Sequence, residues 1–297
     1  MSTLQTLLNA VGLGATYALM AVGIGLVFGV LRLVNFAYGQ LVMAGAYALV
    51  LTSERGWPDW ASVLTCLGVV LGLSLLMELL VFRPLRDASP ATMLVATFAV
   101  AFLLQAIALL EFGSLGRIST VLASLFEPVS TGELQVRWVT IVAIAVGAVA
   151  LLGLVLLLGR TRVGLHMRAA AADFQTARLL GVNADRVITA AVLISGVLAA
   201  AVAVILTVQT PLVTPDFALR DTIIVLVGVV VGGLDRLWTA TLGGFAIGFA
   251  TSLLGELLPA AKAVYLDSAV FALVIAVLLL RPAGLFAPLR ARPVERV

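Results

Sequence analysis

The stretch RTRVGLHMRAAAADFQTARLLGVNADR (Arg160–Arg186) decides how the rest of this chain folds. It carries five arginines, two aspartates and the only histidine, and long apolar runs flank it on both sides. An ionised group at the centre of a bilayer costs about 2.5–3.5 kcal/mol on insertion scales. The segment is therefore predicted to lie outside a bilayer, and its arginine excess predicts the cytoplasmic side.

Two short helices are predicted within this segment. Apolar and small residues recur there at helical spacing: Met167, Ala170, Ala171, Phe174 and Ala177. Asp173 is the predicted N-cap of the second helix, Gly181 its C-terminal stop, and Asn183 the N-cap of the next span. We interpret the pair as surface helices whose alanine-rich face lets another protein approach closely. A solvated, alanine-rich connector is the alternative.

The composition is that of a membrane protein. Of the 297 residues, 62% are hydrophobic and only 11% are charged. A soluble domain is nearer half apolar and a quarter charged. The sequence predicts an all-α polytopic membrane protein that forms one membrane domain over residues 1–297. The basic residues do not alternate with exposed aromatics in a patch, so nucleic-acid binding is not expected.

About nine apolar runs follow one another along the chain, and a span needs about 20 such residues. The runs are Leu4–Val30, Leu41–Leu51, Ala61–Phe82, Ala91–Leu110, Trp138–Leu158, Arg186–Thr207, Thr222–Leu234, Thr239–Leu258 and Tyr265–Leu280. We expect eight to nine transmembrane or discontinuous helices. Four small-xxx-small pairs predict tight helix contacts: Gly25/Gly29, Gly68/Gly72, Gly228/Gly232 and Gly244/Gly248.

Two of the apolar runs are too short to cross a bilayer comfortably. Each belongs to a glycine-rich region with a break that carries one arginine, namely Gly23–Leu51 and Thr222–Leu258. Paired broken segments point to a substrate path, although glycine-rich packing helices would look similar. Whether Val34–Gln40 and Leu234–Thr239 cross or re-enter the membrane stays open.

Polar residues in the first break are the candidates for a transport pathway. Polar side chains at membrane depth are tolerated where they line a cavity or the protein interior. The candidates are Asn35, Phe36, Tyr38 and Gln40. Gln105, within the run Ala91–Leu110, is expected to be buried or to face a pore.

The distribution of charge predicts the orientation. If the runs alternate in direction, most arginines share the side of Arg160–Arg186, and most acids lie opposite. This places the N-terminus outside and the C-terminus in the cytoplasm. The polar segment Glu111–Arg137 then becomes an external loop, which we expect to contain a short surface helix.

No signature of an enzyme is present in the sequence. One histidine and one cysteine exclude an HExxH or CxxC site, so no metal ligands are proposed. The phosphate-binding pattern GxxxxGK[ST] is also absent, so the chain itself is not expected to hydrolyse nucleotides. Glu78, Glu256 and Asp267 lie near span ends. We favour snorkelling or helix-end carboxylates over a proton relay for them.

Four stretches resemble the permease subunits of branched-chain amino acid ABC importers, specifically the H-type Liv permease. They are GATYALMAVGIGLVFGVLRLVNFAYGQLVMAGAY (Gly14–Tyr47), TRVGLHMRAAAADFQTARLLGVNADRV (Thr161–Val187), VGVVVGGLDRLWTATLGGFAIGF (Val227–Phe249) and FALVIAVLLLRPAGLF (Phe271–Phe286). They follow the family's order at both ends and in the centre of the chain.

The resemblance implies a function and a set of partners. The chain would be the permease subunit of an ATP-driven importer for branched-chain or related amino acids in a bacterial inner membrane. A second, M-type permease, two ATP-binding subunits and an external solute-binding protein would complete it, and ATP would bind only to those partner ATPases. The residues matching the coupling segment that docks on the ATPase are Ala172, Asp173, Ala177, Arg178 and Gly181.

Several alternatives stay open at this point. The family usually has a histidine at Tyr38 and an acid at Gln40, so the solute is open, and relatives carry urea or amides. Pairing with an identical or a different permease is also open. A secondary transporter working alone, with Glu78 or Asp267 as an ion site, is the rival from another class, and a membrane scaffold is a third.

Overall fold

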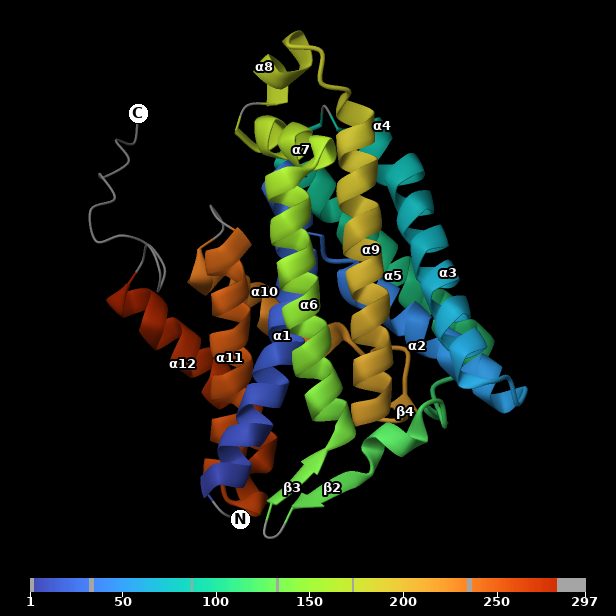
Figure 1. Ribbon diagram of the computed structural model, residues 1–297, viewed down its shortest axis with the longest axis vertical. Coiled ribbons are helices and arrows are strands. Elements are labelled where there is room, and N and C mark those ends of the chain that lie inside the picture. Colours follow the sequence, from blue (N-terminus) through green and yellow to red (C-terminus); the bar gives the residue numbers. More distant parts are fainter. Residues whose placement is uncertain are drawn as a thin grey trace.

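The computed structural model describes residues 3–31, 35–86, 88–131, 134–172, 174–233 and 237–281. Helices dominate it, and the few strands are short (Figure 1). The longer helices are α1 (Thr3–Leu31), α2 (Tyr38–Glu54), α3 (Asp59–Met77), α5 (Pro90–Phe112), α6 (Trp138–Arg160), α7 (Arg162–Ala172), α9 (Ala184–Gln209), α10 (Leu219–Gly232), α11 (Leu237–Leu257) and α12 (Leu266–Leu280). The shorter ones are the π-helix η1 (Glu78–Phe82), α4 (Arg83–Leu85), the 3₁₀ helices η2 (Ala123–Phe126) and η3 (Ala260–Tyr265), and α8 (Phe174–Leu179).

Seven helical segments in the described part of the chain are long and apolar enough to cross a membrane. They contain α1, α3, α5, α6, α9, α11 and α12. The helices α2 and α10 have only 17 and 14 residues. Seven spans and two shorter helices confirm the expected eight to nine transmembrane or discontinuous helices.

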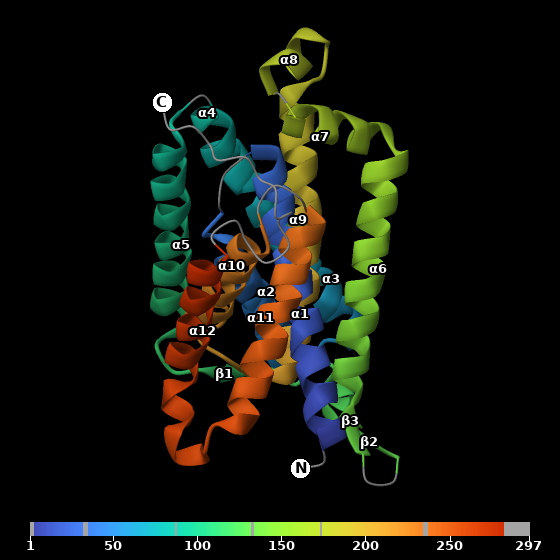
Figure 2. The same ribbon diagram turned by 90° about the vertical axis from the view of Figure 1, so that its left-hand side faces the viewer.

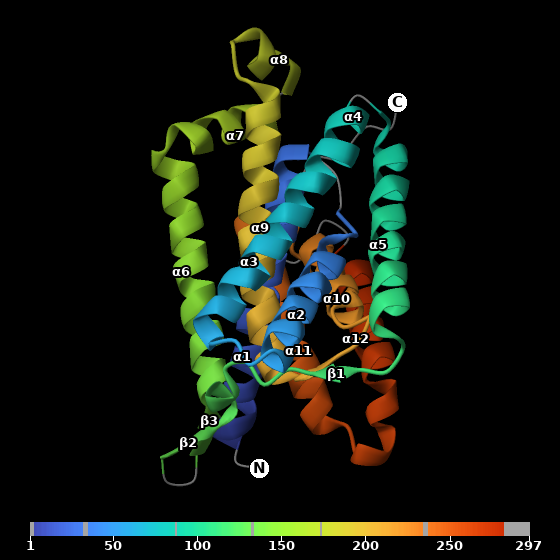
Figure 3. The ribbon, with the colours of Figure 1, turned by 90° about the vertical axis from the view of Figure 1, so that its right-hand side faces the viewer.

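Both predicted breaks are present. The helix α1 ends at Leu31 and α2 starts at Tyr38, while α10 ends at Gly232 and α11 starts at Leu237. Residues 32–34 and 234–236 lie outside the described residues. The views from two sides agree that α2 begins well inside the bundle and runs towards one end (Figures 1 and 3).

The two ends of the molecule differ in character. The helices α4, α7 and α8 lie at one end, which we call the α7–α8 end (Figure 1). The N-terminal end of α1 and the hairpin of β2 (Pro128–Thr131) and β3 (Leu134–Arg137) lie at the other, the hairpin end (Figure 1). Here β1 (Arg117–Ile118) also pairs antiparallel with β4 (Leu212–Val213). Among the described residues of Glu111–Arg137, the predicted short surface helix is the 3₁₀ helix η2. The other regular elements of this loop are the strands β1, β2 and β3.

The helices α1 and α9 form the centre of the bundle. Within an apolar stretch of 18 residues, 83% of α1 and 72% of α9 is buried inside the chain. The corresponding buried shares are 17% for α6 and 11% for α12. An apolar helix that the chain itself leaves exposed must be covered by lipid or by another subunit. The helices α3, α5, α6 and α12, of which 28% or less is buried in this way, therefore face the surroundings.

Glycines bring α11 against two neighbours. A Cβ on Gly244 would lie 2.4 Å from Ala21 Cβ of α1, and one on Gly243 would lie 2.2 Å from the Gly228 carbonyl oxygen of α10. Such contacts let helix backbones approach closely, as the Gly228/Gly232 and Gly244/Gly248 pairs predicted. The pair Gly25/Gly29 makes such a contact only at Gly25, where a Cβ would lie 3.2 Å from Leu237 Cδ1, since a Cβ on Gly29 meets nothing within 4 Å. A Cβ on Gly68 or Gly72 also meets nothing within 4 Å in this chain.

Candidate functional site: the α7–α8 end and the broken helices

The helix α7 lies across the end of the bundle from α6 towards α9, and α8 projects beyond the end of α9 (Figure 2). Thr161 begins α7, because its side-chain oxygen accepts a hydrogen bond from the Gly164 N–H at 3.0 Å. Met167 and Ala170 are 1% and 4% exposed and pack into the main core. The face interpreted as open to a partner is therefore turned largely towards the chain's own bundle.

The turn after α8 presents the surface that remains free. Gly181 has φ +87°, and the Val182 N–H donates to the Ala177 carbonyl oxygen at 3.0 Å, which ends the helix. Leu179 and Leu180 at this turn are 88% and 80% exposed. The predicted helix stop is confirmed. An apolar turn held in a fixed shape is a surface on which a partner can dock.

The same turn leads directly into a capped membrane helix. The Asn183 side-chain oxygen accepts a hydrogen bond from the Arg186 N–H at 3.2 Å and so begins α9, as predicted. No slack linker therefore separates the turn from α9.

The residues assigned to coupling are placed as follows. Ala177 is buried, at 4% exposed, and Gly181 shapes the turn. Ala172 and Arg178 lie in α7 and α8, and only their backbone is described. Asp173 lies outside the described residues.

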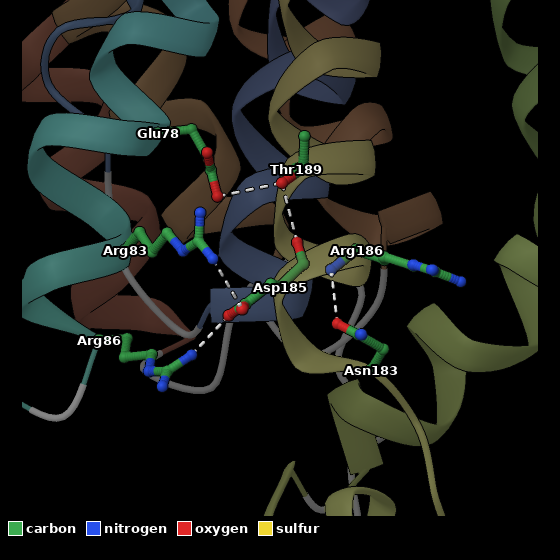
Figure 4. A network of polar contacts seen from close by, with 7 residues as sticks. All are labelled: Glu78, Arg83, Arg86, Asn183, Asp185, Arg186 and Thr189. Atoms are coloured by element: carbon green, nitrogen blue, oxygen red, sulfur yellow. Dashed lines mark hydrogen bonds and ion pairs between the residues drawn. The ribbon is translucent and has the colours of Figure 1, made fainter.

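Asp185 ties the start of α9 to the end of α3. Its carboxylate accepts from Arg86 Nη1 at 2.5 Å and from Arg83 Nη2 at 3.3 Å, both on the segment that continues α3 through α4 (Figure 4). An acid in the first turn of a helix is also favoured by the helix dipole. We call this contact the Asp185 clamp.

A second contact lies one turn deeper, at Glu78. The Thr189 hydroxyl of α9 donates to Glu78 Oε1 at 3.0 Å and also lies 2.8 Å from the Asp185 carbonyl oxygen (Figure 4). Glu78 is only 2% exposed, and its Oε2 has no hydrogen-bond partner among the described residues. The snorkelling interpretation of Glu78 was therefore wrong, since this carboxyl is held inside the bundle against α9.

Glu78 is also the first residue of the π-helix η1, which lies between α3 and α4. Single π-helical turns inside α-helices are rare and are frequent at functional sites. The wider turn weakens the regular hydrogen-bond ladder of α3 where the clamp holds it. This geometry suits a place at which α3 bends when α9 moves.

The predicted pathway residues surround the start of α2. Asn35 is buried and folds the backbone locally, because its side-chain oxygen accepts from the Ala37 N–H at 3.0 Å. Phe36 is half-buried and stacks on Phe98 of α5, with ring centroids 3.9 Å apart. Tyr38 and Gln40 are buried, at 0% and 1% exposed. Of the four, only Phe36 therefore reaches an accessible surface.

Three buried polar atoms near the start of α2 have no partner among the described residues. They are Tyr38 Oη, Gln40 Oε1 and Thr222 Oγ1. Gly39 lies between them, and a Cβ there would be 2.4 Å from Thr222 Oγ1 of α10. Buried polar atoms without partners are rare and call for a ligand, water or a changed conformation. Thr222 Oγ1 lies where the two discontinuous helices meet, and Tyr38 Oη lies against α1, where a Cβ on Gly23 would be 2.4 Å from it.

Sequence reasoning missed the clamp and its neighbour Thr189. Asp185 was assigned no contact, and the arginines that follow the run Ala61–Phe82, Arg83 and Arg86, entered only as part of the charge distribution that predicts the orientation. The available signal was a basic turn after one span and an acid in the first turn of another, both assigned to the same side of the membrane.

Comparison with known proteins identifies the family. A family profile described as "Branched-chain amino acid transport system / permease component" matches residues 6–280. The chain belongs to this family. It is 30% identical over 294 residues to the high-affinity branched-chain amino acid transport system permease protein BraD of Pseudomonas aeruginosa, covering 95% of each chain.

Other relatives agree with this assignment. The corresponding protein LivH of Escherichia coli is 30% identical over 302 residues, with 95% of this chain and 94% of LivH covered. A solved metal-chelate type ABC transporter in an inward-facing conformation has the same fold, with a TM-score of 0.53 at 19% identity over 94% of this chain and 87% of the other. The chain is thus a multi-pass permease component of a transport system.

Proposed function

We propose that this chain is the permease subunit of an ATP-driven importer that moves branched-chain or related amino acids across a bacterial inner membrane. The family match over residues 6–280 supports the transport system and its class of solute. The exposed residues Leu179 and Leu180, which directly precede Gly181 and the Asn183 cap, carry the proposal of coupling to an ATPase.

The proposed assembly contains a second permease, two ATP-binding subunits and an external solute-binding protein. ATP binds to the ATP-binding subunits, and residues 1–297 act as one permease domain. The coupling residues are proposed to be Ala172, Asp173, Ala177, Arg178 and Gly181. The pathway is proposed to include Asn35, Phe36, Tyr38 and Gln40, and the three unpartnered polar atoms near the start of α2 support it.

The proposed orientation places the α7–α8 end in the cytoplasm and the N-terminus outside. The described residues contain seven helical segments that could span a membrane, and this odd number supports a cytoplasmic C-terminus. Arginines at the α7–α8 end support this side by the positive-inside rule. They are Arg83, Arg86, Arg160, Arg162, Arg168 and Arg186.

Reconstitution tests the proposal. The chain is co-expressed with a candidate M-type permease, ATPases and binding protein, and leucine uptake into liposomes is measured. We expect uptake that needs ATP and every partner. Uptake by the chain alone under an ion gradient, indifferent to ATP, would instead identify a secondary transporter. Transport of urea or amides but not leucine would change the solute class.

Asp185→Asn is expected to uncouple the importer. The clamp is partly exposed, so its loss changes stability by no more than about 1 kcal/mol. The movement of α9 is then no longer passed to α3, and leucine transported per ATP is expected to fall by about fivefold or more. Uptake and ATP hydrolysis are measured on the same liposomes.

A charge exchange provides the control for this prediction. Asp185→Arg combined with Arg86→Asp is expected to restore part of the coupling, because the ion pair is rebuilt in reverse. Asp59→Asn, an exposed acid at the hairpin end, is expected to change nothing. If Asp185→Asn transports as much leucine per ATP as the unaltered chain, the clamp does not transmit the movement of α9 to α3.

Tyr38→Phe is expected to lower uptake without lowering stability. Its hydroxyl is buried without a partner, so removing it costs the resting fold no hydrogen bond. If the hydroxyl pairs with the solute during transport, uptake falls about fivefold, the value of one hydrogen bond of about 1 kcal/mol. Tyr47→Phe is the matched control, because the Tyr47 hydroxyl also lacks a partner but lies outside the predicted path. Equal uptake in the two variants would remove Tyr38 from the pathway.

A further inference from the structure

Two adjoining hollows open on the side of the chain formed by α5, α10 and α12. The first has a volume of about 390 Å³ and lies between α5 and the segment that leads into α10. The second has a volume of about 260 Å³ and lies between α10 and α12. Asp216 lines both. The two hollows therefore meet at one acidic residue.

The wall of the first hollow is a face of α5 that mixes apolar side chains with one amide. Phe102, Ala106 and Leu109 lie at helical spacing along it, and Gln105 lies among them. Gln105 is half-buried within a membrane span and has no hydrogen-bond partner among the described residues. Polar side chains in spans normally face a cavity or a polar path, and this one lines the hollow.

The lining of the second hollow combines two residues of opposite charge with apolar side chains. Arg220 and Asp216 line it together with Ile223 and Phe271. Arg220 donates from Nε to Asp267 Oδ1 at 2.8 Å, and its guanidinium has further N–H donors beyond this pair. Asp216 is exposed and takes part in no ion pair with the described residues. The second hollow is therefore lined by one acidic and one basic residue that are not paired with each other.

An aromatic row joins the first hollow to the broken start of α2. Phe102, which lines the hollow, stacks on Phe98 with ring centroids 6.4 Å apart, and Phe98 stacks on Phe36. The accessible member of the predicted pathway, Phe36, is therefore linked to the lining of the first hollow by two aromatic contacts.

We propose that these hollows form a subsite for a zwitterionic α-amino acid with an aliphatic side chain. Asp216 binds the α-ammonium, Arg220 binds the α-carboxylate, and the side chain lies against Phe102 and Leu109. Gln105 completes the polar contacts of the ammonium through its amide oxygen. The inference rests on the proposed function and adds to it the two residues that bind the α-ammonium and the α-carboxylate of the solute.

Charge-removing variants test the subsite in the complete reconstituted importer with its binding protein. Asp216→Asn and Arg220→Gln are each expected to lower leucine uptake about tenfold or more, since each removes a charge-assisted contact. ATP hydrolysis stimulated by the binding protein is expected to persist, because both positions lie away from the α7–α8 end. Asp267→Asn is the matched control: it breaks the same ion pair but keeps Arg220, so leucine uptake is expected to be retained.

A change of ligand preference separates recognition from a structural role. Binding of leucine and of 4-methylpentanoate, which lacks the ammonium, is measured on the purified importer without binding protein by saturation-transfer NMR. Wild type is expected to favour leucine. Asp216→Asn is expected to lose that preference and Arg220→Gln to bind neither. Unchanged preference in Asp216→Asn would overturn the subsite.

The remaining outcomes are also decisive. If wild type with all partners takes up no leucine, the proposed function fails and the subsite fails with it. If wild type transports and both variants transport equally well, only the subsite is wrong. Loss of assembly or of stimulated ATP hydrolysis in both variants would assign the two residues to structure and would likewise overturn the proposal.

Discussion

Gly243→Val is expected to prevent the chain from forming its folded bundle. A Cβ at this position would lie 2.2 Å from the Gly228 carbonyl oxygen and 2.6 Å from Gly232 Cα. Both neighbours are backbone, so no side chain can turn aside and α10 must separate from α11. Overpacking typically costs about 1–3 kcal/mol, and a clash with backbone lies at or above the upper end.

Size-exclusion chromatography and thermal unfolding in detergent measure this effect. Gly153→Val in α6 is the matched control, because it has the same β-branched side chain in a helix and its Cβ meets nothing within 4 Å. We expect the control to elute and unfold like the unaltered chain, and Gly243→Val to yield little monodisperse protein. Equal yields and melting temperatures would mean that α10 and α11 do not touch as described.

Gly181→Val is expected to have the second-largest effect, this time on transport rather than on folding. Gly181 has φ +87°, a region that β-branched residues avoid, and holding a side chain there costs about 1–3 kcal/mol. The turn that exposes Leu179 and Leu180 must then change shape. Because the turn lies outside the spans, membrane insertion is expected to be normal while uptake falls about tenfold or more.

Gly56→Val provides the matched control for Gly181→Val. Gly56 also has a positive φ, +66°, and neither glycine has a neighbour within 4 Å of its Cβ position. Gly56 lies in the turn between α2 and α3 at the opposite end. The same backbone strain there is expected to leave coupling intact. Equal uptake and equal ATP hydrolysis in both variants would show that the turn after α8 does not couple the chain to the ATPase.

Features that depend on neighbours along the chain were predictable. The apolar runs gave the spans, because crossing a bilayer depends on local length and composition. Gly181 and Asn183 were correctly assigned as helix stop and helix cap, because caps are local hydrogen-bond patterns. The close-packed pair Gly244/Gly248 was also found, whereas the equally regular pair Gly68/Gly72 faces open space. Spacing alone does not say whether a partner helix is present.

Contacts between distant parts of the chain were not predictable. Glu78 was expected to be a snorkelling or helix-end carboxylate, yet it is buried and meets Thr189, which lies 111 residues away. The apolar face of α7 was assigned to a partner, yet Met167 and Ala170 pack against the chain's own core. In each case the residue type allowed both outcomes, and the choice depended on which helix lies beside it.

Composition and local pattern were thus sufficient for the membrane class, the broken helices and the arginine-rich segment that stays out of the bilayer. These follow from transfer energies and backbone hydrogen bonds, which involve residues close in the chain. Tertiary structure was needed for the Asp185 clamp, the unpartnered polar atoms near Tyr38 and the hollows around Asp216. Those features arise from packing between helices far apart in sequence, which no single stretch of the chain encodes.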